Sequence, residues 1–346
     1  MKKIIFPIIL SVLVSICAAQ DIHFSQFNNA PLSLNPATTG AFNGSHRVIA
    51  NYKSQWNSID KTYLTYGLSY DAGLLRSQLN GGILGIGIQL FKDVSGINKM
   101  GLTQENISIA YHLPVNKHNL FSVGIQSGFS QRNIKSENMQ WASQYDASSA
   151  NGFNSALNSG EPMTFGNYNY GEVSAGLLWT YNKSTATLSS NDAKKFQMGL
   201  AVYHVNRPKQ TYFDVLDKRL FMKMALHMNA HIGFKNTNFA LVPSAVWYKQ
   251  GPCNEILAGT LFRFGLNGAS RYTGFVREAA LSFGAFYRVN DAVIATSQFE
   301  WNNLLLCVSY DVNTSDLSGA TKYAGGLEVA LRYQFPLPDA KNNSLF

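Results

Sequence analysis

Two histidines, His227 and His231, are the residues whose type most suggests metal binding. They stand four positions apart, with Asn229 between them, in a stretch where apolar and polar residues alternate. Such alternation predicts a β-strand, in which residues four apart lie about 13 Å from one another. A single metal ion cannot bind two side chains at that distance. We therefore interpret the pair as polar side chains that face the inside of the fold.

Glycine-rich stretches are the second candidate for chemistry, because glycine loops can cradle phosphate groups. Gly81-Gly82 and Gly85-Ile86-Gly87 are not followed by Gly-Lys-Ser/Thr, and no helix pattern begins there. We interpret them as strand glycines that ease curvature or allow close packing. The sequence also lacks a Gly-x-Ser-x-Gly elbow and a His-Glu-x-x-His motif. It therefore predicts no catalytic residue, no cofactor site and no metal site.

The acidic residues form no pair that suggests acid–base catalysis. Glu328 and Arg332 lie on one face of the last predicted strand, about 13 Å apart, so we expect each to meet neighbouring strands. Asp71 and Asp311 each follow a tyrosine at the end of a predicted strand. Aspartate commonly starts turns and tyrosine anchors at membrane interfaces, so we interpret both aspartates as turn residues.

The last predicted strand, 325–335, shows the pattern of the elements that carry these residues. Its strict alternation of apolar and polar residues is the mark of a strand with one buried face. Such a strand, ending in aromatics, is typical of an outer-membrane β-barrel, although a soluble β-sandwich strand has the same pattern. One face carries Leu327, Val329, Leu331, Tyr333 and Phe335, and the other carries Glu328, Ala330, Arg332 and Gln334.

The first 19 residues are predicted to be a signal peptide. Two lysines precede an apolar run, 4–16, that is short for a membrane span, and small residues lead to a cleavage site after Ala19. A lipoprotein signal with Cys17 acylated is the alternative. It is disfavoured because Ile16 stands where such signals usually have a small residue. In either case the mature protein leaves the cytoplasm.

The composition of the remaining chain favours a membrane barrel. Charged residues make up 14% of the sequence, against roughly 25% in ordinary soluble domains. No apolar stretch after residue 19 approaches the length of a membrane helix. An exported chain that is poor in charge, rich in aromatics and without membrane helices is typical of an outer-membrane β-barrel.

The net charge and the cysteine content exclude few further classes of protein. Without Lys2 and Lys3 the formal net charge falls from +8 to +6, and the basic residues are scattered. Because there is no dense basic stripe, nucleic acid is not an expected partner, whereas outer-membrane lipid and anionic lipopolysaccharide are. Two cysteines remain after the signal, Cys253 and Cys307, and whether they pair is left open.

Fourteen alternating stretches follow one another over 47–335. An even number of antiparallel strands is what a single-chain bacterial barrel requires, so we predict one barrel whose last strand pairs with the first. The gap at 130–170 lacks periodicity and is predicted to be a long outer loop. If both ends of the chain lie in the periplasm, the odd-numbered connections face outward. The short turn 289–291 on that side counts against this assignment.

Two segments flank the predicted barrel. The first, 20–46, contains two prolines and several turn formers, which argue against a strand. It is either a periplasmic leader or a segment tucked into the lumen, and its many apolar residues favour the lumen. The second, 336–346, begins with prolines at 336 and 338 that end the last strand. It is predicted to be a periplasmic tail.

Several motifs resemble those of the PorP/SprF family, over essentially the whole mature chain. The start of the mature chain, the end of the first strand and the last two strands carry the resemblance. Small departures occur at His23, Thr38-Thr39 and Val329. The matching residues include Gln20 to Phe27, Asn35-Pro36-Ala37, Gly40, Gln55-Trp56, Ser309-Tyr310-Asp311, and Gly326 to Tyr333 with Glu328.

The resemblance implies an outer-membrane component of the type IX secretion system of Bacteroidota. Such a protein is expected to assist secretion or surface anchoring of a partner protein such as an adhesin, in some members linked to gliding. Its expected partners are other type IX components and a secreted or surface protein, and no enzymatic activity is implied. A FadL-like channel for small hydrophobic solutes is the alternative, since such barrels also carry an early Asn-Pro-Ala segment. A soluble exported β-sandwich adhesin is the third possibility.

Two further groups of residues are assigned roles as hypotheses. The end of the last strand resembles the signal that the barrel-assembly machinery recognises, with alanine where glycine is usual. The long loop is the candidate partner-binding surface because it carries aromatic side chains. The assembly signal comprises Glu328, Ala330, Tyr333 and Phe335, and the loop aromatics are Trp141, Tyr145 and Phe153.

Overall fold

The computed structural model describes most of the chain outside its two ends. The predicted signal peptide (1–19), Gln20, Trp56 and residues 338–346 of the predicted tail lie outside the described residues, so these predictions stay untested. The described residues are 21, 23–55, 63–79, 81–96, 99–134, 139–149, 152–160, 167–183, 193–210, 219–267, 279–316 and 318–337.

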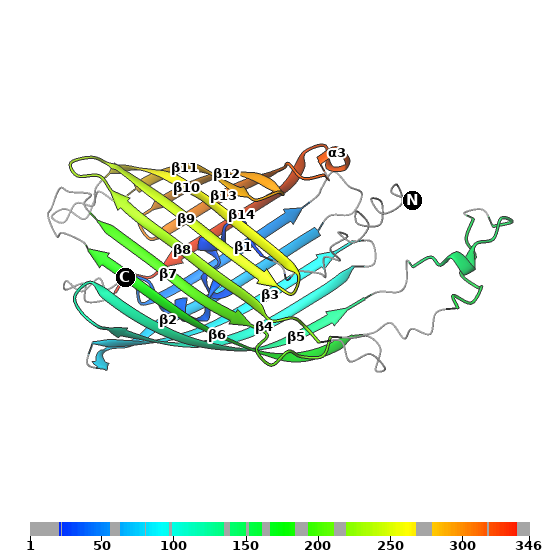
Figure 1. Cartoon of the computed structure of the whole chain (residues 1–346), viewed down its shortest axis with the longest axis horizontal. Helices are drawn as coiled ribbons and strands as arrows, with labels where there is room; N and C mark the ends of the chain where they lie inside the picture. Colours follow the sequence, from blue (N-terminus) through cyan, green and yellow to red (C-terminus); the bar gives the residue numbers. More distant parts are fainter. Residues whose placement is uncertain are drawn as a thin grey trace, which may run out of the picture.

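Within this part of the chain, fourteen antiparallel strands close into one barrel (Figure 1). Each strand pairs with its neighbours in sequence, and β1 closes the barrel by pairing with β14, Arg47 opposite Gln334. The predicted fold is confirmed. The strands are β1 (His46–Gln55), β2 (Tyr63–Leu79), β3 (Gly82–Ser95), β4 (Met100–Pro114), β5 (Asn119–Asn133), β6 (Tyr168–Lys183), β7 (Lys194–Tyr203), β8 (Lys223–Gly233), β9 (Phe239–Gln250), β10 (Cys253–Asn267), β11 (Ala279–Arg288), β12 (Ala292–Trp301), β13 (Leu304–Asn313) and β14 (Ala324–Gln334).

The barrel forms because its strands alternate apolar and polar residues. In β4, Ile107 and Ile109 are 61% and 52% exposed on the outer face, whereas Asn106 and Ser108 are buried on the lumen face. Most of the other strands expose large apolar side chains in the same way. An outward apolar band around a polar interior is what a barrel in lipid requires.

The two ends of the barrel differ in the length of their connections. At the long-loop end, on the right in Figure 1, β5 and β6 are joined by 134–167 and β7 and β8 by 204–222. At the short-turn end, β8 and β9 are joined by 234–238 and β12 and β13 by two residues, Asn302 and Asn303. The short turn 289–291 lies at the long-loop end, as the numbering of the connections predicts.

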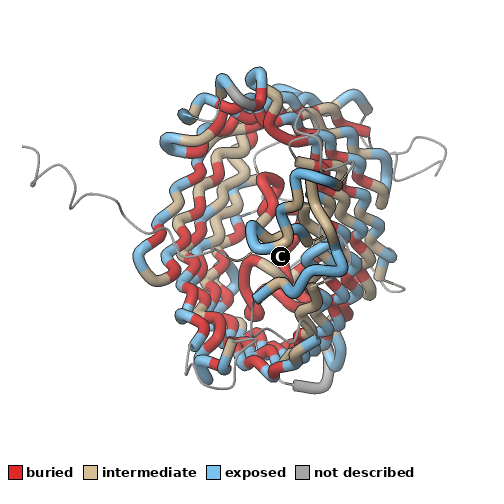
Figure 2. The backbone as a smooth tube through the Cα atoms, turned by 90° about the vertical axis from the view of Figure 1, so that its right-hand side faces the viewer, coloured by how far each residue is buried: buried red, intermediate tan, exposed pale blue. Residues whose placement is uncertain are grey.

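Residues 23–45 lie inside the barrel, where Figure 2 shows buried backbone within the ring of strands. With Asp21 they form a segment that we name the plug. Phe27, Leu32 and Leu34 are at most 3% exposed, which confirms the predicted position in the lumen. The plug contains three short helices, η2 (Phe27–Asn29), α2 (Pro31–Leu34) and η3 (Pro36–Thr38).

The plug runs through the lumen from the long-loop end to the short-turn end. The Asp21 N–H donates to the Gln250 side chain (2.8 Å), at the end of β9. The Ser45 N–H donates to the Phe335 carbonyl (2.9 Å), just beyond β14. The assumption that both chain ends lie at the short-turn end is therefore wrong for the N-terminal side. The odd-numbered connections do lie together at one end, because β1 begins and β14 ends at the other. That this end faces outward stays a prediction.

Two further helices lie in connections at the long-loop end, η4 (Ala142–Gln144) and α3 (Ser318–Thr321). None of the helices that the structure describes is long and apolar enough to cross a membrane. Cys253 and Cys307 are both buried and do not form a disulfide with each other.

Candidate functional site in the barrel lumen

Glycines form the part of the lumen wall on which the plug rests. A Cβ atom added to Gly124 would lie 2.5 Å from backbone atoms of Pro36 and Ala37. At Gly85 it would overlap the Thr39 carbonyl. Glycine therefore allows the backbone of the plug to approach the strands closely, as interpreted from the sequence. We name these residues the glycine floor: Gly85, Gly87, Gly124, Gly176 and Gly199.

Asn35 ties the plug to the glycine floor. Its side chain is fully buried and caps η3 by accepting a hydrogen bond from the Ala37 N–H (2.8 Å). Its amide nitrogen donates to the Leu177 carbonyl of β6 (2.9 Å). Pro36 opens η3 with its φ already fixed for a helix. The Asn35-Pro36-Ala37 motif is thus a capped turn with small side chains, which fits directly against glycine.

The two histidines of β8 face the lumen, as the alternation predicts. His227 is 2% exposed, and its Nε2 lies 3.1 Å from the Asn35 amide nitrogen. His231 lines a cavity nearer the short-turn end. Among the described residues, no group of three or more His, Cys, Asp or Glu is placed to hold a metal ion. His227 instead acts as a wall contact for the plug.

Asp71 pairs with Arg47 on the adjacent strand and holds the plug near its last turn. Arg47 Nε and Nη2 donate to the carboxylate at 2.9 and 2.7 Å, and the Gly40 N–H donates to it at 2.7 Å. The interpretation of Asp71 as a turn residue is wrong. It lies fully buried within β2, because this strand continues to Leu79.

Glu328 of β14 holds the backbone of the plug nearer its start. Its carboxylate accepts hydrogen bonds from the Ser25 and Gln26 N–H groups, at 2.9 and 3.0 Å. Lys53 Nζ lies 3.1 Å from the same carboxylate and also donates to the His23 carbonyl (2.9 Å). Both charged side chains are less than one-tenth exposed. Buried charges are tolerated when they are paired and hydrogen-bonded, as they are here.

Asp311 lies beside this group. The Ser25 hydroxyl donates to its carboxylate, and Arg288 Nη2 lies 2.8 Å from the same oxygen. Arg288 also pairs with Asp291 at 2.7 Å. The interpretation of Asp311 as a turn residue is wrong as well, since it faces the lumen within β13, which continues to Asn313.

Outside the strands, His204 anchors the start of the plug. Its Nε2 lies 2.5 Å from the Asp21 carboxylate and its Nδ1 lies 2.8 Å from Glu172. Burial alone would lower the pKa of His204, but the hydrogen bonds and charges of the two carboxylates raise it to about 9. Burial would likewise raise the pKa of Asp21, but His204 lowers it below its usual range. The anchor at neutral pH is an imidazolium between two carboxylates.

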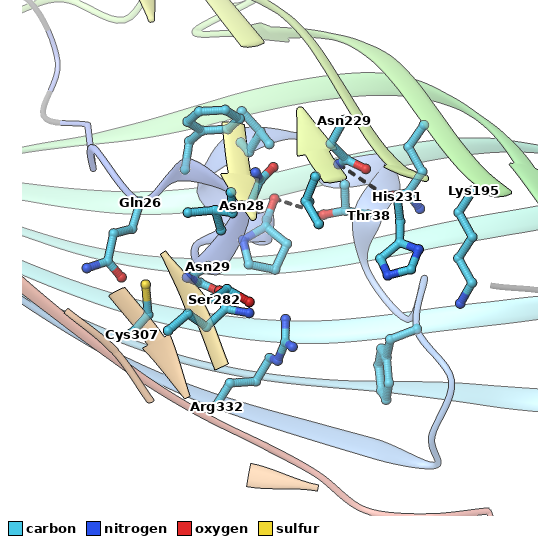
Figure 3. Close-up of a pocket in the computed structure, with 18 of the residues that line it drawn as sticks. Gln26, Asn28, Asn29, Thr38, Lys195, Asn229, His231, Ser282, Cys307 and Arg332 are labelled. Atoms are coloured by element: carbon cyan, nitrogen blue, oxygen red, sulfur yellow. Dashed lines mark hydrogen bonds between the residues drawn. The ribbon is translucent and has the colours of Figure 1, made fainter. Parts of the chain in front are cut away.

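Cavities of different size lie beside the plug in the described part of the lumen, and a small one of about 50 Å³ is lined by Gln89 and Tyr203. Two are much larger than this one. The larger, about 570 Å³, reaches the short-turn end at Asn43, Lys195 and Gln334, and we name it the lumen cavity (Figure 3). The smaller, about 370 Å³, lies at the long-loop end beside Asp21 and His23. The two cavities share no lining residue, and residues of the plug line both of them.

The structure brings some of the family-motif residues together and separates others. Gln55 lines the smaller cavity, and Tyr310 points outward with 45% of its surface exposed. Those that gather in or around the plug are Asn35, Pro36, Ala37, Gly40, Asp311 and Glu328.

The residues of the predicted assembly signal lie on both faces of the end of β14. Glu328 and Ala330 face the lumen and are 1% exposed. Tyr333 and Phe335 face outward, and their rings pack edge to face with centroids 4.8 Å apart. Glu328 has a structural partner in Lys53, and the role of these residues in assembly stays a prediction.

The aromatic residues of the long loop lie apart from the plug. Figure 1 shows this connection projecting well beyond the ends of the strands. Tyr145 and Phe153 form an isolated β-bridge with their rings edge to face at 6.2 Å, and Trp141 precedes η4. Tyr145 remains 63% exposed. A partner-binding role for this loop stays a prediction.

Sequence reasoning missed the cations that hold the plug and the purpose of the glycine floor. Arg47, Lys53 and Arg288 each occupy an inward position of a strand. A charged residue at an inward position of a predicted strand was the sequence signal that could have identified each of these cations. The identity of each partner depends on how distant strands line up, which no local pattern reports.

One family matches nearly the whole chain. The family model described as type IX secretion system membrane protein PorP/SprF matches residues 16–333. No curated protein matches the chain.

Solved barrels resemble this chain in fold alone. CdiB from Acinetobacter baumannii is 10% identical with a TM-score of 0.39, and the match covers 84% of this chain and 60% of CdiB. BamA from Haemophilus ducreyi is 9% identical with a TM-score of 0.42, over 84% of this chain and 70% of that one. A FadL homologue from Pseudomonas aeruginosa is 10% identical with a TM-score of 0.44, over 87% and 93%.

Proposed function

Because the chain belongs to the PorP/SprF family of type IX secretion system membrane proteins, we propose that it assists the secretion or surface anchoring of a partner protein such as an adhesin. The barrel lies in the outer membrane, and its family and fold are not those of an enzyme class. It works by recognising the partner and not by catalysis. Other components of the type IX system are its further partners.

The plug inside the lumen is the observation that carries this proposal. A polypeptide that crossed the barrel would have to displace the plug and break its bonds to the wall, among them those from the Ser25 and Gln26 N–H groups to Glu328 and from the Gly40 N–H to Asp71. Each buried group that loses its only hydrogen-bond partner costs about 1–3 kcal/mol. A barrel built in this way supports recognition at its surfaces better than conduction of an unfolded chain.

The long-loop end offers the surface for recognition. Long loops of outer-membrane barrels face the cell exterior, where a secreted partner is displayed. The loop holds its own shape through bonds such as those from Ser143 to the Ser159 carbonyl and from Gln144 to the Leu157 carbonyl. It presents Tyr145 to solvent, and aromatic side chains supply much of the binding energy at protein interfaces.

Replacing Trp141, Tyr145 and Phe153 together by serine tests the loop. We expect the barrel to assemble with its normal heat-modifiable migration, because the loop lies beyond the wall. We expect at least one type IX substrate to disappear from the surface of intact cells, as measured by surface proteomics. Ser148→Ala with Asn158→Ala, in the same loop, is the matched control and should leave display unchanged.

Deleting the whole gene tests the proposed function independently of the role of the loop. If deletion removes a substrate from the surface but the triple loop variant does not, the partner binds elsewhere on the barrel. Unchanged display of every type IX substrate after deletion would refute the proposed function.

A channel for small hydrophobic solutes is the second candidate, because apolar residues line part of the lumen cavity. A channel needs a continuous path, and the two cavities share no lining residue. Conductance and solute uptake of the purified barrel in planar bilayers and liposomes discriminate the two. Solute flux through the wild-type protein would favour the channel.

A further inference from the structure

The lumen cavity has more positive than negative charge on its wall. Its volume of about 570 Å³ lies within the range of small-molecule sites, roughly 300–1,000 Å³. Glu300 is the one carboxylate among its described lining residues. The cationic side chains that line it are Arg47, Lys195, Arg263 and Arg332, of which Lys195 and Arg332 appear in Figure 3.

Two of these cations already have a carboxylate. Arg47 is held by Asp71, and Arg263 binds Glu300 through Nε and Nη2 at 3.2 and 2.8 Å. Arg332 differs, since none of the residues that the structure describes gives it an ion pair or a hydrogen bond. The charges it interacts with are the repelling one of Arg47 and the attracting one of Glu300, which is already bound to Arg263.

The inward neighbours of Arg332 on its own strand carry no negative charge that Arg332 would neutralise. Its inward neighbours on β14 are Ala330, which is small, and Gln334, which is neutral. A guanidinium without a partner inside a barrel is unfavourable, because partial burial removes water that would solvate it. The residue is therefore costly in the empty protein and becomes favourable when an anion is present.

Part of the cavity wall is apolar. Phe27 and Leu34 of the plug meet Leu261 and Phe286 in one buried cluster, and Val242 packs against it. All of these residues also line the cavity. A ligand that fills the space must therefore present an apolar part to this cluster and an anionic part to Arg332.

We propose that the lumen cavity binds a small amphiphilic monocarboxylate, with its apolar part against Phe27 and Phe286 and its carboxylate on Arg332. One unpaired guanidinium matches one negative charge, and its planar fork matches a carboxylate bidentately. The ligand enters from the short-turn end, where the cavity reaches the strand ends. The plug closes the other side, so the site retains its ligand and does not conduct it. This inference does not rest on the proposed function.

Three probes test the site on the unaltered full-length protein in lipid nanodiscs, by isothermal titration calorimetry. 4-Phenylbutyrate has both features, 4-phenylbutanamide lacks the charge, and butyrate lacks the apolar part. We expect 4-phenylbutyrate to bind at one site and each of the others to bind roughly tenfold or more weakly. Equal affinity for the carboxylate and the amide would overturn the proposal, as would the absence of 4-phenylbutyrate binding. This comparison needs no variant, so it stands even where a substitution impairs assembly.

Arg332→Gln locates the site. We expect it to weaken 4-phenylbutyrate binding roughly tenfold or more, and Arg332→Lys to weaken it less. Lys249→Gln removes an exposed charge from β9 and should leave affinity unchanged. Arg332→Gln should also leave the empty barrel as resistant to urea as the wild type, or more so. Wild-type affinity in Arg332→Gln would overturn the proposal, and so would a loss of urea resistance with affinity retained.

Discussion

The plug is held in two different ways along its length. From Asp21 to Gln26 it is held by charge, through His204, Glu328 and their neighbours. From Leu32 to Thr39 it is held by shape, against glycines whose Cβ atoms would occupy the space of its backbone. The first half depends mainly on ionised side chains. The second depends mainly on close packing and on neutral hydrogen bonds such as that from Asn35 to the Leu177 carbonyl, with one charged donor, Arg47, on the Thr38 carbonyl.

The two kinds of contact have different roles in holding the plug. Charged contacts act at a distance and are sensitive to pH and salt, so they define where the start of the plug lies. Close packing is insensitive to both but tolerates no added atom. The two halves should therefore respond to different perturbations.

Removing Glu328 should have the largest effect. Glu328→Ala leaves the buried Lys53 ammonium unpaired and removes the acceptor of two plug N–H groups. We expect a loss of about 3–5 kcal/mol in the free energy of unfolding, measured by urea titration in detergent micelles. Glu105→Ala, at an exposed carboxylate of β4, should change it by less than about 0.5 kcal/mol. Equal losses in the two variants would show that charge does not hold this half.

Filling the glycine floor should rank next. In Gly124→Ala the new methyl group meets backbone atoms of Pro36 and Ala37, which cannot move aside as a flexible side chain would. We expect a loss of about 3 kcal/mol, the upper part of the overpacking range, and raised conductance in planar bilayers as the plug shifts.

Gly171→Ala is the matched control for this experiment. The nearest atom to a Cβ at Gly171 is the Gly128 carbonyl oxygen at 3.8 Å, an ordinary contact. If both glycine variants retain wild-type stability and conductance, close packing does not hold the second half of the plug.

Raising the pH should release only the charged half. The pKa of His204 is raised to about 9 from its ordinary 6.5, so its stabilisation is full below about pH 6.5 and is lost as the pH rises through 9. We expect the wild type to lose roughly 2 kcal/mol relative to His204→Gln between pH 6 and pH 10, measured by urea titration. A difference between the two proteins that is constant over this range would exclude His204 as the anchor.

The smallest effect is expected where the plug ends and the chain enters β1. Phe335 packs against Tyr333 and His46, and its backbone bonds to Ser45 and His46. Phe335→Ala should cost about 1 kcal/mol and lower the yield of assembled barrel, whereas truncation after Leu337 should spare it. Equal yields of heat-modifiable barrel from both variants would refute the assignment of Phe335 to an assembly signal.

The wall of the barrel could be predicted from the sequence because its signal is local. Alternation in 325–335 identifies both the strand and the face on which Glu328 lies, since successive strand residues point to opposite sides. The apolar residues of 20–46 likewise indicated a buried segment, because Phe27 and Leu34 could not remain in water.

The contacts of the plug could not be predicted, because they join residues far apart in the chain. The sequence indicates a turn at Asp71 because it does not show that β2 continues beyond this residue. The partner of Asp71, Arg47, is identified only by the register of β1 with β2. Likewise, nothing in the sequence around Gly124 indicates that Pro36 lies against it. Register and direction are set by the closed barrel as a whole, and no window of sequence contains them.

The bond from Ser25 to Glu328 spans 303 residues, which has a consequence for the order of folding. Contacts of such separation form late, because the chain between them must first be ordered. The plug begins at the long-loop end. Either the strands therefore close around the plug, or its charged start must pass through the lumen of a barrel that has already closed. Wrapping keeps those charges hydrated until their partners arrive. Pairing of β14 with β1 therefore completes the wall and, at the same moment, brings in the carboxylate that secures the first residues of the plug.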